Sequence, residues 1–375
     1  MCTINDEKTL SELGEKFIVR EITSSLHPSD KLLDGFGHDA AFVDISVADD
    51  EVLVINSDRS GLNIAYKLGL AGAECVGDLG VSHAISDVVA AGGCPKTVTV
   101  ALLLPPNTTL RFVRELMKGV EDSAAKYGAI VTGGDTKKSH KFAMVVTAVG
   151  IAHKKNRLRR STAQNGDALV VTGFLGSMLL GTHALKNNLD LSKQVRSLLE
   201  DALVVQNPPF QLGRAFADAG VATACMDISD GLSGTLFTLC SASGLGAIID
   251  ENKIPINPLL SDLANSLNLR PMQLSLAGGD WQYLYTIPQS KLAEAEAIAQ
   301  KVGWPISILG HTHQSDFIGA RTLEGEFRHI NRIENDSFSD KINGKGYFES
   351  LTTPISCFGS SIDSKIIEHT FLNLV

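Results

Sequence analysis

Carboxylates recur in this chain where an apolar run gives way to serine or glycine. The apolar run 221–226 leads into Asp227 and Asp230, with Ser229 between them and a helical pattern at 232–240 after them. Carboxylates at the end of a buried strand cost desolvation free energy unless a positive charge lies against them. A cation such as Mg²⁺ prefers oxygen ligands and leaves coordination positions open for phosphate. The alternative is that both aspartates only cap the following helix.

Acidic residues occur in a similar setting at five further places. They are Asp39 in 37–41, Asp58 after Asn56 and Ser57, Asp87 on a predicted helix 74–91, Asp135 after Gly133 and Gly134, and Asp280 after Gly278 and Gly279. A single aspartate of this kind is a turn residue. So many indicate several Mg²⁺ ions bridging a polyphosphate, with glycines that let the backbone approach the phosphates.

Common nucleotide-binding and nucleophile motifs do not occur in the sequence. It contains no G-x-x-x-x-G-K-[ST] loop, no G-x-G-x-x-G after a strand and no kinase catalytic-loop signature. Nothing resembles a G-x-S-x-G elbow. If the chain binds ATP, a less common fold binds it.

The residues that could perform chemistry must be positioned by the surrounding secondary structure. Strand and helix patterns alternate along the chain, which predicts an α/β (α+β) protein. We expect helices at 7–23, 74–91, 108–127, 192–204, 210–219 and 291–302. We expect strands at 52–55, 97–104, 129–131, 142–150, 168–171, 221–226, 244–250 and 306–310. The His311-Thr312-His313 segment is expected on a surface loop.

The length of the chain predicts its domain organisation. A chain of 375 residues predicts two domains, since single cores rarely exceed about 250–300 residues. We place the N-terminal domain at 1–155 and the C-terminal domain at 156–335, with the boundary in a basic run at 153–160. A C-terminal extension, 336–375, looks like an appended tail.

The remaining composition favours a soluble small-molecule enzyme of the cytoplasm. A net charge of −9 argues against nucleic acid as a partner. We find no apolar stretch of the roughly 20 residues that span a bilayer, and no secretory signal at the start. The six scattered cysteines are expected to be reduced core thiols.

Seven motifs, in order, resemble the thiamine-monophosphate kinases of the aminoimidazole ribonucleotide synthetase superfamily. They are 14–18 for G-E-F-x-L-I, 37–41 for G-D-D-A-A, 57–58 for T-D, 85–92 for L-S-D-L-A-A-M-G, 133–136 for G-G-D-T, 158–173 for L-x-R-S followed by G-D and V-T-G, and 227–232 for D-[IL]-S-D-G-L. The resemblance implies a two-domain fold in which the N-terminal mixed sheet joins that of a second copy as a barrel in a homodimer. It implies an α/β C-terminal domain and bound Mg·ATP.

The resemblance also implies roles for individual residues. The metal ligands would be Asp39, Ser57, Asp58, Asp87, Asp135 and Asp227, with Asn56 contributing through its backbone. Gly134, Asp135, Arg160 and Ser229 would bind ATP, Arg160 by charge-assisted hydrogen bonds to phosphate. Asp230 would lie near the transferred phosphoryl group, so we name Asp230 and Arg160 as the catalytic residues.

The chain departs from the resemblance mainly on the acceptor side. His38 replaces the first acid of G-D-D, and Arg59 begins a segment that lacks the substrate-binding histidine of the family. The G-G-E-D-Y-E-L motif reads Gly-Gly-Asp-Trp-Gln-Tyr-Leu at 278–284, and 344–347 lacks the tryptophan of W-K-G-Y. We therefore expect a different or altered small-molecule acceptor, contacted by Arg59, Asp280 and Trp281.

Three functions follow from these residues. The first is an ATP-dependent phosphotransferase, whose catalysis is mostly positioning and electrostatics. The second is an ATP-dependent ligase or cyclase that activates an amide or carboxyl oxygen as a phosphate before a nitrogen displaces it. The third, a nucleotide-binding scaffold without turnover, is disfavoured because clustered carboxylates repel one another.

Overall fold

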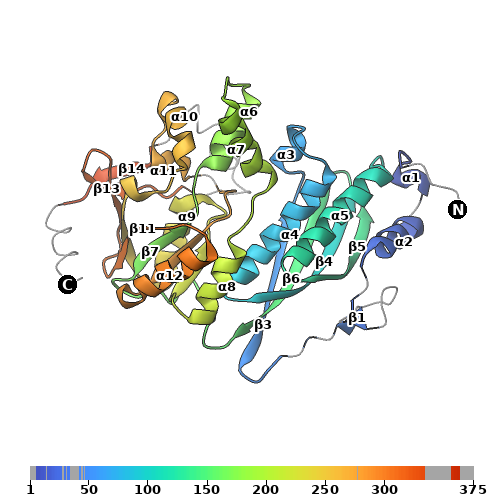
Figure 1. Cartoon of the computed structure of the whole chain (residues 1–375), viewed down its shortest axis with the longest axis horizontal. Coiled ribbons are helices and arrows are strands. Elements are labelled where there is room, and N and C mark those ends of the chain that lie inside the picture. Colours follow the sequence, from blue (N-terminus) through green and yellow to red (C-terminus); the bar gives the residue numbers. More distant parts are fainter. Residues whose placement is uncertain are drawn as a thin grey trace. The chain divides into compact units, whose positions relative to one another are not determined.

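The computed structural model describes residues 6–13, 15–27, 29–30, 32–33, 42–43, 45, 47–276, 278–333 and 356–363. Asp39 and the segment 344–347 lie outside these ranges. The chain divides into two compact units, one of residues 1–89 and 93–154 and the other of residues 90–92 and 155–375 (Figure 1). No helix among the described residues is long and apolar enough to cross a membrane.

The first unit is built on a four-stranded sheet of order β3-β6-β4-β5, in which only the β4–β5 pair is parallel. Its strands are β1 Leu32–Leu33, β2 Phe42–Val43, β3 Glu51–Ser60, β4 Cys94–Leu104, β5 Ile130–Lys138 and β6 Ala143–His153. Its helices are α1 Leu10–Leu13, α2 Glu15–Ser25, α3 Ile64–Lys67, α4 Ala73–Ala90 and α5 Leu110–Lys126. Strands β1 and β2 pair with each other, antiparallel.

Helices α4 and α5 lie side by side across one face of this sheet (Figure 1). They approach closely because each has a glycine at the crossing. A Cβ on Gly77 would lie 2.0 Å from the carbonyl oxygen of Leu116, and one on Gly119 would lie 1.9 Å from that of Glu74. Thr109 caps α5 by accepting a hydrogen bond from the backbone N–H of Phe112.

The second unit contains an eight-stranded sheet of order β14-β13-β12-β9-β11-β7-β10-β8, antiparallel except for the β12–β9 pair. Its strands are β7 Ala168–Thr172, β8 Ala224–Asp227, β9 Gly246–Asp250, β10 Tyr283–Ile287, β11 Ile306–His313, β12 Ile318–Arg321, β13 Phe327–Ile330 and β14 Phe358–Ser361. Its α-helices are α6 Ser177–Lys186, α7 Lys193–Val204, α8 Phe210–Ala219, α9 Gly231–Ser243, α10 Ser261–Ser266, α11 Pro271–Leu274 and α12 Leu292–Val302. The 3₁₀-helices are η1 Glu251–Lys253, η2 Pro258–Leu260 and η3 Gln289–Lys291.

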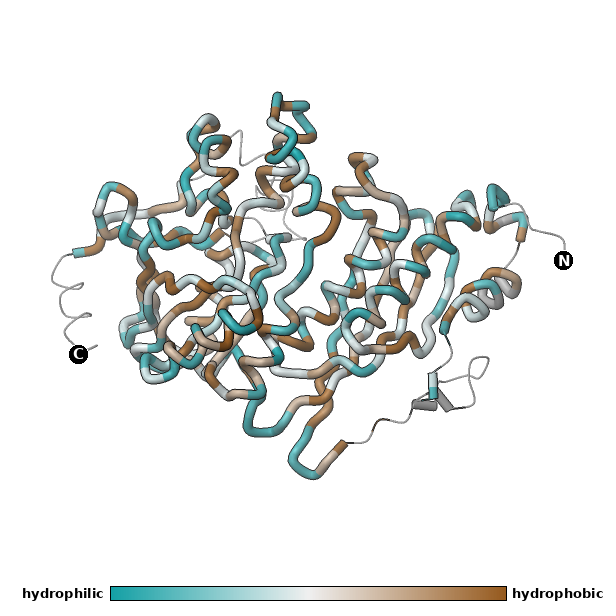
Figure 2. Tube along the Cα trace, viewed as in Figure 1, coloured by the Kyte–Doolittle hydropathy of each residue, from teal (hydrophilic) through white to brown (hydrophobic). Residues whose placement is uncertain are grey.

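Apolar residues gather along the strands of both sheets, whereas many connecting loops are hydrophilic (Figure 2). In the second unit, Leu169 and Leu284 of the sheet pack with Leu232 and Leu236 of α9 in one core cluster. A second cluster joins α6, α7 and α10. This packing fixes the end of β8 and the start of α9, where the D-I-S-D-G-L segment lies.

Several sequence predictions differ from the structure. The strand expected at 52–55 continues to Ser60, because β6 pairs with its whole length, so the polar residues 56–58 lie inside a strand. The strand expected at 129–131 continues to Lys138 through parallel pairing with β4. His313 is not on a surface loop but on β11, 2% exposed. The segment 358–361 forms β14 against β13, so the tail is not wholly appended.

Candidate active site

Asp227 ends β8, a strand whose four residues are all buried, and it is only 4% exposed itself. Burial raises the pKa of Asp227 above the ordinary value for aspartate. A hydrogen bond from Ser229 and the positive charge of Arg160 lower it, whereas the carboxylate of Asp230 raises it. A carboxylate in this setting is stabilised by an added cation, so its chemistry fits a metal ligand.

Asp230 occupies the N-cap position of α9, but its side chain makes no capping hydrogen bond. The capping interpretation is therefore wrong for Asp230. The backbone conformation at this residue (φ −106°, ψ 19°) leads into Gly231 at φ +82°. This sharp turn places Asp230 three residues after Asp227, half-buried, at the junction of strand and helix.

Two glycines let the loop 228–231 pack against the chain around residues 275–279. A Cβ on Gly231 would lie 2.0 Å from the carbonyl oxygen of Leu276, and one on Gly278 would lie 1.4 Å from that of Ser229. The backbone N–H of Leu232 also donates to the carbonyl oxygen of Ser275, at 2.7 Å. No other residue type fits at these two glycines without displacing Ser229 or Asp230.

Asp280 and Trp281 follow directly in the same loop. The Asp280 carboxylate accepts hydrogen bonds from the backbone N–H groups of Gly176 (2.7 Å) and Met178 (2.9 Å), at the start of α6. Burial raises the pKa of Asp280 to about 6, although these hydrogen bonds act in the opposite direction. Trp281 is half-buried and has a left-handed backbone conformation, with φ of +50°.

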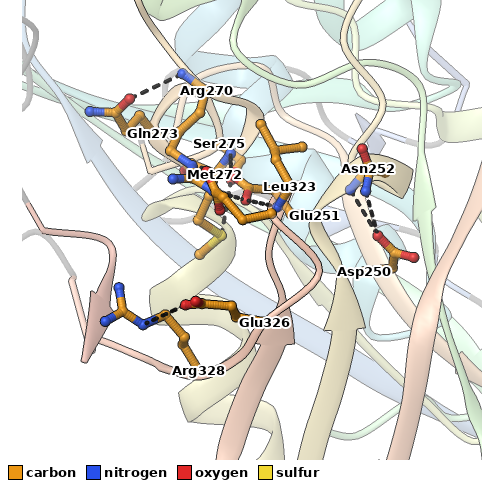
Figure 3. Close-up of polar contacts among 11 residues, drawn as sticks. Asp250, Glu251, Asn252, Arg270, Met272, Gln273, Ser275, Leu323, Glu326 and Arg328 are labelled. Atoms are coloured by element: carbon orange, nitrogen blue, oxygen red, sulfur yellow. Dashed lines mark hydrogen bonds and ion pairs between the residues drawn. The ribbon is translucent and has the colours of Figure 1, made fainter. Parts of the chain in front are cut away.

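A buried ion pair anchors the helix that precedes this loop (Figure 3). Glu251 is fully buried, and its Oε1 accepts a 2.7 Å hydrogen bond from Nε of Arg270. The same carboxylate accepts from the backbone N–H groups of Met272 and Leu323, at 3.3 and 3.2 Å. Because Arg270 begins the turn into α11, this pair holds the chain that leads to Ser275.

In the first unit, the structure brings Asn56 and Asp87 together. The side-chain amide of Asn56 on β3 donates to the carboxylate of Asp87 on α4 at 2.7 Å. Asp58, two residues further along β3, has its side chain on the same face of the sheet. Ser57 lies on the opposite face, where its hydroxyl group is 2.7 Å from that of Thr147.

Gly134 and Asp135 lie within β5, beside β4. A Cβ on Gly134 would lie 1.8 Å from the carbonyl oxygen of Val100, so only glycine allows this approach of the two strands. Asp135 pairs in register with Ala101, and through β6 this row continues to Arg59 on β3. Asp135 and Arg59 are both exposed and share the face of Ser57.

A pocket of about 210 Å³ lies next to this segment, within the first unit. It is lined by apolar side chains of α2, β4, α5 and β5 and by residues 133–136: Ile22, Leu26, Val100, Leu102, Met117, Val131 and Gly133 to Thr136. Thr23 of α2 completes the lining. The expected nucleotide segment 133–136 therefore borders a largely apolar cavity.

The expected metal ligands are only partly assembled. Asp227 and Asp230 are close to each other, and Asn56 contacts Asp87, but the described residues contain no group of three or more acids, histidines or cysteines arranged to hold a metal. Asp39 lies outside the described residues. Sequence reasoning missed Gln282, whose side chain bonds to Thr172 and Trp304, because the sequence offers no signal for this contact.

Two family models match the chain, the AIR synthase related protein N-terminal domain over residues 37–152 and its C-terminal domain over residues 164–320. The chain belongs to this family. Similar curated proteins include a thiamine-monophosphate kinase of Methanospirillum hungatei, 30% identical over 67% of this chain and 80% of that protein. The thiamine-monophosphate kinase of Pyrococcus horikoshii is 27% identical over 75% of this chain and 84% of its own length.

Solved structures of the same fold include thiamine-monophosphate kinase from Stenotrophomonas maltophilia. It has a TM-score of 0.71 at 24% identity and covers 81% of this chain and 95% of its own. The hydrogenase maturation protein HypE of E. coli has a TM-score of 0.70 at 18% identity, covering 86% and 99%. The resemblance and the mixed α/β AIR synthase-like fold expected from the sequence are thus confirmed.

These findings support an ATP-dependent phosphotransferase or related activity of the AIR synthase type. An enzyme of the kinase type is also what the sequence motifs predict. The identity of the acceptor is a separate question, because the chain departs from its relatives in the segments expected to contact it.

Proposed function

We propose that this chain is an ATP- and Mg²⁺-dependent phosphotransferase that acts on a small acceptor different from, or altered relative to, thiamine monophosphate. The observation that carries the proposal is the buried Asp227, whose carboxylate is hydrogen-bonded by Ser229 and whose pKa is lowered by the charge of Arg160 and raised by that of Asp230. Two acids and one guanidinium at the end of a strand suit a metal-bound phosphate, because the acids hold the metal and the arginine contacts the phosphate.

The residues present fit Mg²⁺ and ATP. In the second unit, Asp227 would hold a metal, Ser229 would donate to a phosphate oxygen, and Asp230 would orient the acceptor near the transferred group. In the first unit, Asp87 would hold a metal while Asn56 orients its carboxylate, with Asp58 on the same face and Asp39 as further expected ligands; the expected ligands Ser57 and Asp135 lie on the opposite face of the sheet. Mg²⁺, when bound, neutralises charge on the phosphates.

We assign the pocket beside residues 133–136 to the base of the nucleotide. Its volume, about 210 Å³, is below the roughly 300–1,000 Å³ of sites that take whole drug-sized ligands. The lining is mostly apolar, as suits a planar ring, and Gly133 and Gly134 contribute to it without side chains. This supports a base in the pocket and phosphates along the glycine-rich strand.

The relatives are named for their action on thiamine monophosphate, and the structure of AaThiL was solved in complex with AMPPCP and TMP. The test is ³¹P NMR of the full chain with Mg·ATP and thiamine monophosphate, with Asp227→Asn in parallel. We expect the native chain to consume ATP only with a suitable acceptor, and the variant to consume none. Formation of ADP and thiamine diphosphate by the native chain would overturn the altered acceptor but keep the kinase.

The proposed homodimer has support in exposed apolar side chains on one face of the first unit's sheet. Leu53 and Ile55 on β3 are 50% and 65% exposed, and Leu103 on β4 lies on the same face. Exposed apolar side chains in one patch favour a protein partner. Light scattering should report a dimer that Ile55→Asp disrupts, whereas the control Val205→Asp, in the second unit, should leave the mass unchanged.

A further inference from the structure

Ser243 is the last residue of α9, and it connects this helix to the loop that follows Arg160. Its hydroxyl group donates a 2.8 Å hydrogen bond to the backbone oxygen of Arg160. The same hydroxyl group accepts a 3.2 Å hydrogen bond from the backbone N–H of Ala163. Because a serine hydroxyl can donate and accept at the same time, Ser243 holds the loop at two points.

A second hydroxyl group, that of Thr162, holds the same loop against the start of β8. Its Oγ1 lies 2.7 Å from the backbone oxygen of Thr223, the residue before β8, and 3.1 Å from the backbone oxygen of Arg159. Thr162 can therefore donate to an acceptor on the sheet or on its own loop. The backbone of Arg160 lies between two carbonyl groups that side chains hold, its own and that of Arg159.

Thr223 is itself fixed by a buried polar cluster. Its Oγ1 donates to Oδ2 of Asp167 at 2.5 Å and lies 2.6 Å from the hydroxyl oxygen of Thr286 on β10. Asp167 is 3% exposed, and its Oδ2 also accepts a 2.8 Å hydrogen bond from the backbone N–H of Gln164. These hydrogen bonds join the loop after Arg160 to two strands of the sheet, so the sheet fixes the position of this loop.

Helix α9 links this loop to the acids at its other end. The helix follows Asp230 directly and ends at Ser243. Its inward face is fully buried in the core of the second unit, through Leu232, Leu236 and Leu239. Such a close-packed helix does not shift without losing these contacts. One helix therefore carries Asp230 before its first turn and holds the backbone of Arg160 at its last.

The charge of Arg160 acts on the candidate metal ligand. Cys225 and Asp227 are two residues apart on β8, so their side chains share one face of the sheet. Burial raises the pKa values of both side chains, and the positive charge of Arg160 acts on both in the opposite direction. The guanidinium of Arg160 therefore lies near β8, the last strand of the eight-stranded sheet.

We propose that Ser243, together with Thr162, is a positioning residue that fixes the backbone of Arg160, so that its guanidinium meets a phosphate bound at the Asp227–Asp230 loop. The inference rests on the proposed function and adds to it the residues that hold the phosphate-binding arginine. Arg160 is exposed, and a long exposed side chain samples many rotamers. A charge-assisted hydrogen bond to phosphate requires a defined geometry, which an anchored backbone favours.

The test is calorimetric titration of the full-length protein with Mg·ATP, which requires no acceptor. Ser243→Ala removes both hydrogen bonds of the hydroxyl group, and we expect the dissociation constant of Mg·ATP to rise about three- to tenfold. Ser243→Thr keeps the hydroxyl group and should restore near-native affinity. The matched control is Ser241→Ala, at an exposed position in the last turn of α9, which should leave the dissociation constant unchanged.

A double-mutant cycle with Arg160→Ala separates positioning from a general loss of structure. If Ser243 acts through Arg160, Ser243→Ala has no further effect on Mg·ATP affinity once the guanidinium is absent. An equal loss of affinity in both backgrounds shows a structural role only and overturns the inference. If Ser243→Ala does not fold, Thr162→Val takes its place in the cycle, because it removes the other hydroxyl group and keeps the side-chain shape.

The remaining outcomes separate the inference from the proposed function. Weaker Mg·ATP binding in Arg160→Ala, with native affinity in folded Ser243→Ala, overturns the inference and leaves the proposed function in place. Native affinity in Arg160→Ala overturns the inference and removes Arg160 from the proposed site. A native chain that does not bind Mg·ATP overturns the proposed function itself, and the inference falls with it.

Discussion

Asn56 on β3 donates a 2.7 Å hydrogen bond to the carboxylate of Asp87 on α4, so two residues 31 positions apart in the sequence connect this strand to this helix. The second contact of Asn56, to the backbone oxygen of Ala84 at 3.4 Å, directs the amide toward the helix. Through its side chain, Asn56 therefore orients an expected metal ligand. The backbone contribution of Asn56 that the sequence resemblance implies stays a separate prediction.

Asn56→Ala should weaken Mg²⁺ binding, so that turnover requires a higher Mg²⁺ concentration. Loss of a group that orients a metal-binding carboxylate typically costs about 10–100-fold in metal affinity or activity. We expect the Mg²⁺ concentration for half-maximal ATP turnover to rise by about this factor. Asn187→Ala, at the exposed end of α6, is the control, and an unchanged Mg²⁺ requirement in Asn56→Ala would show that the contact is only structural.

Gly278→Ala should abolish most activity, because the new methyl group would lie 1.4 Å from the carbonyl oxygen of Ser229. The loop must move, and a displacement of about 1 Å at a reacting centre costs on the order of 100-fold in rate. Overpacking should also lower the free energy of unfolding by about 1–3 kcal/mol. Urea titration and steady-state turnover measure the two effects.

Gly72→Ala is the matched control for this substitution. Its nearest neighbour would be the flexible carboxylate of Glu115, at 3.3 Å, and the backbone there needs no positive φ. We expect near-native turnover for Gly72→Ala. Equal activity of the two variants would mean that the Ser229–Asp230 loop adapts without loss and does not position the reacting groups.

The buried Asp280 should make stability depend on pH. Its pKa is raised to about 6 in the folded chain, against an ordinary value of 3.8, so the folded state binds this proton more tightly than the unfolded state does. The free energy of unfolding therefore falls as pH rises from about 4 to about 6, by roughly 3 kcal/mol from this group.

Asp280→Asn removes this titration, so the stability of the native chain relative to the variant should decrease over the same pH interval. Urea unfolding at several pH values measures the difference. The matched control variant is Asp218→Asn, at an exposed position on α8. A pH-independent difference between the native chain and Asp280→Asn would contradict the raised pKa.

Secondary-structure bounds are predicted most accurately where local sequence signals mark both ends of a helix or strand. Helix α8 has the predicted bounds, 210–219, because two prolines precede it and Gly220 ends it with φ of +59°. Helix α6 was not predicted, since Gly176 has no capping side chain and the first N–H groups of α6 bond to Asp280, about a hundred residues away.

The candidate site was predictable as a set of residue types but not as an arrangement. Polarity at 56–58 suggested a strand end, whereas pairing with β6 continues the strand and sends Asn56 and Ser57 to opposite faces. Gln282 contacts Thr172 and Trp304, and no local pattern encodes these contacts. Long-range pairing therefore decides which of the predicted residues meet.

Arg270→Leu should be the most destabilising of these substitutions. Glu251 is fully buried, and removal of Arg270 leaves its carboxylate without the guanidinium (Figure 3). Breaking a buried ion pair in this way costs about 3–5 kcal/mol of unfolding free energy. Lys291→Ala, which breaks the exposed pair with Glu294, should cost no more than about 1 kcal/mol.

The double variant Glu251→Gln/Arg270→Leu separates charge from packing. A glutamine at 251 is neutral but still accepts the backbone hydrogen bonds of Met272 and Leu323. If the buried charge causes the loss, the double variant unfolds at higher urea concentration than Arg270→Leu. If it does not, the loss comes from the contact of the Arg270 guanidinium with the Phe358 ring, 5.0 Å away, which ties β14 to this unit.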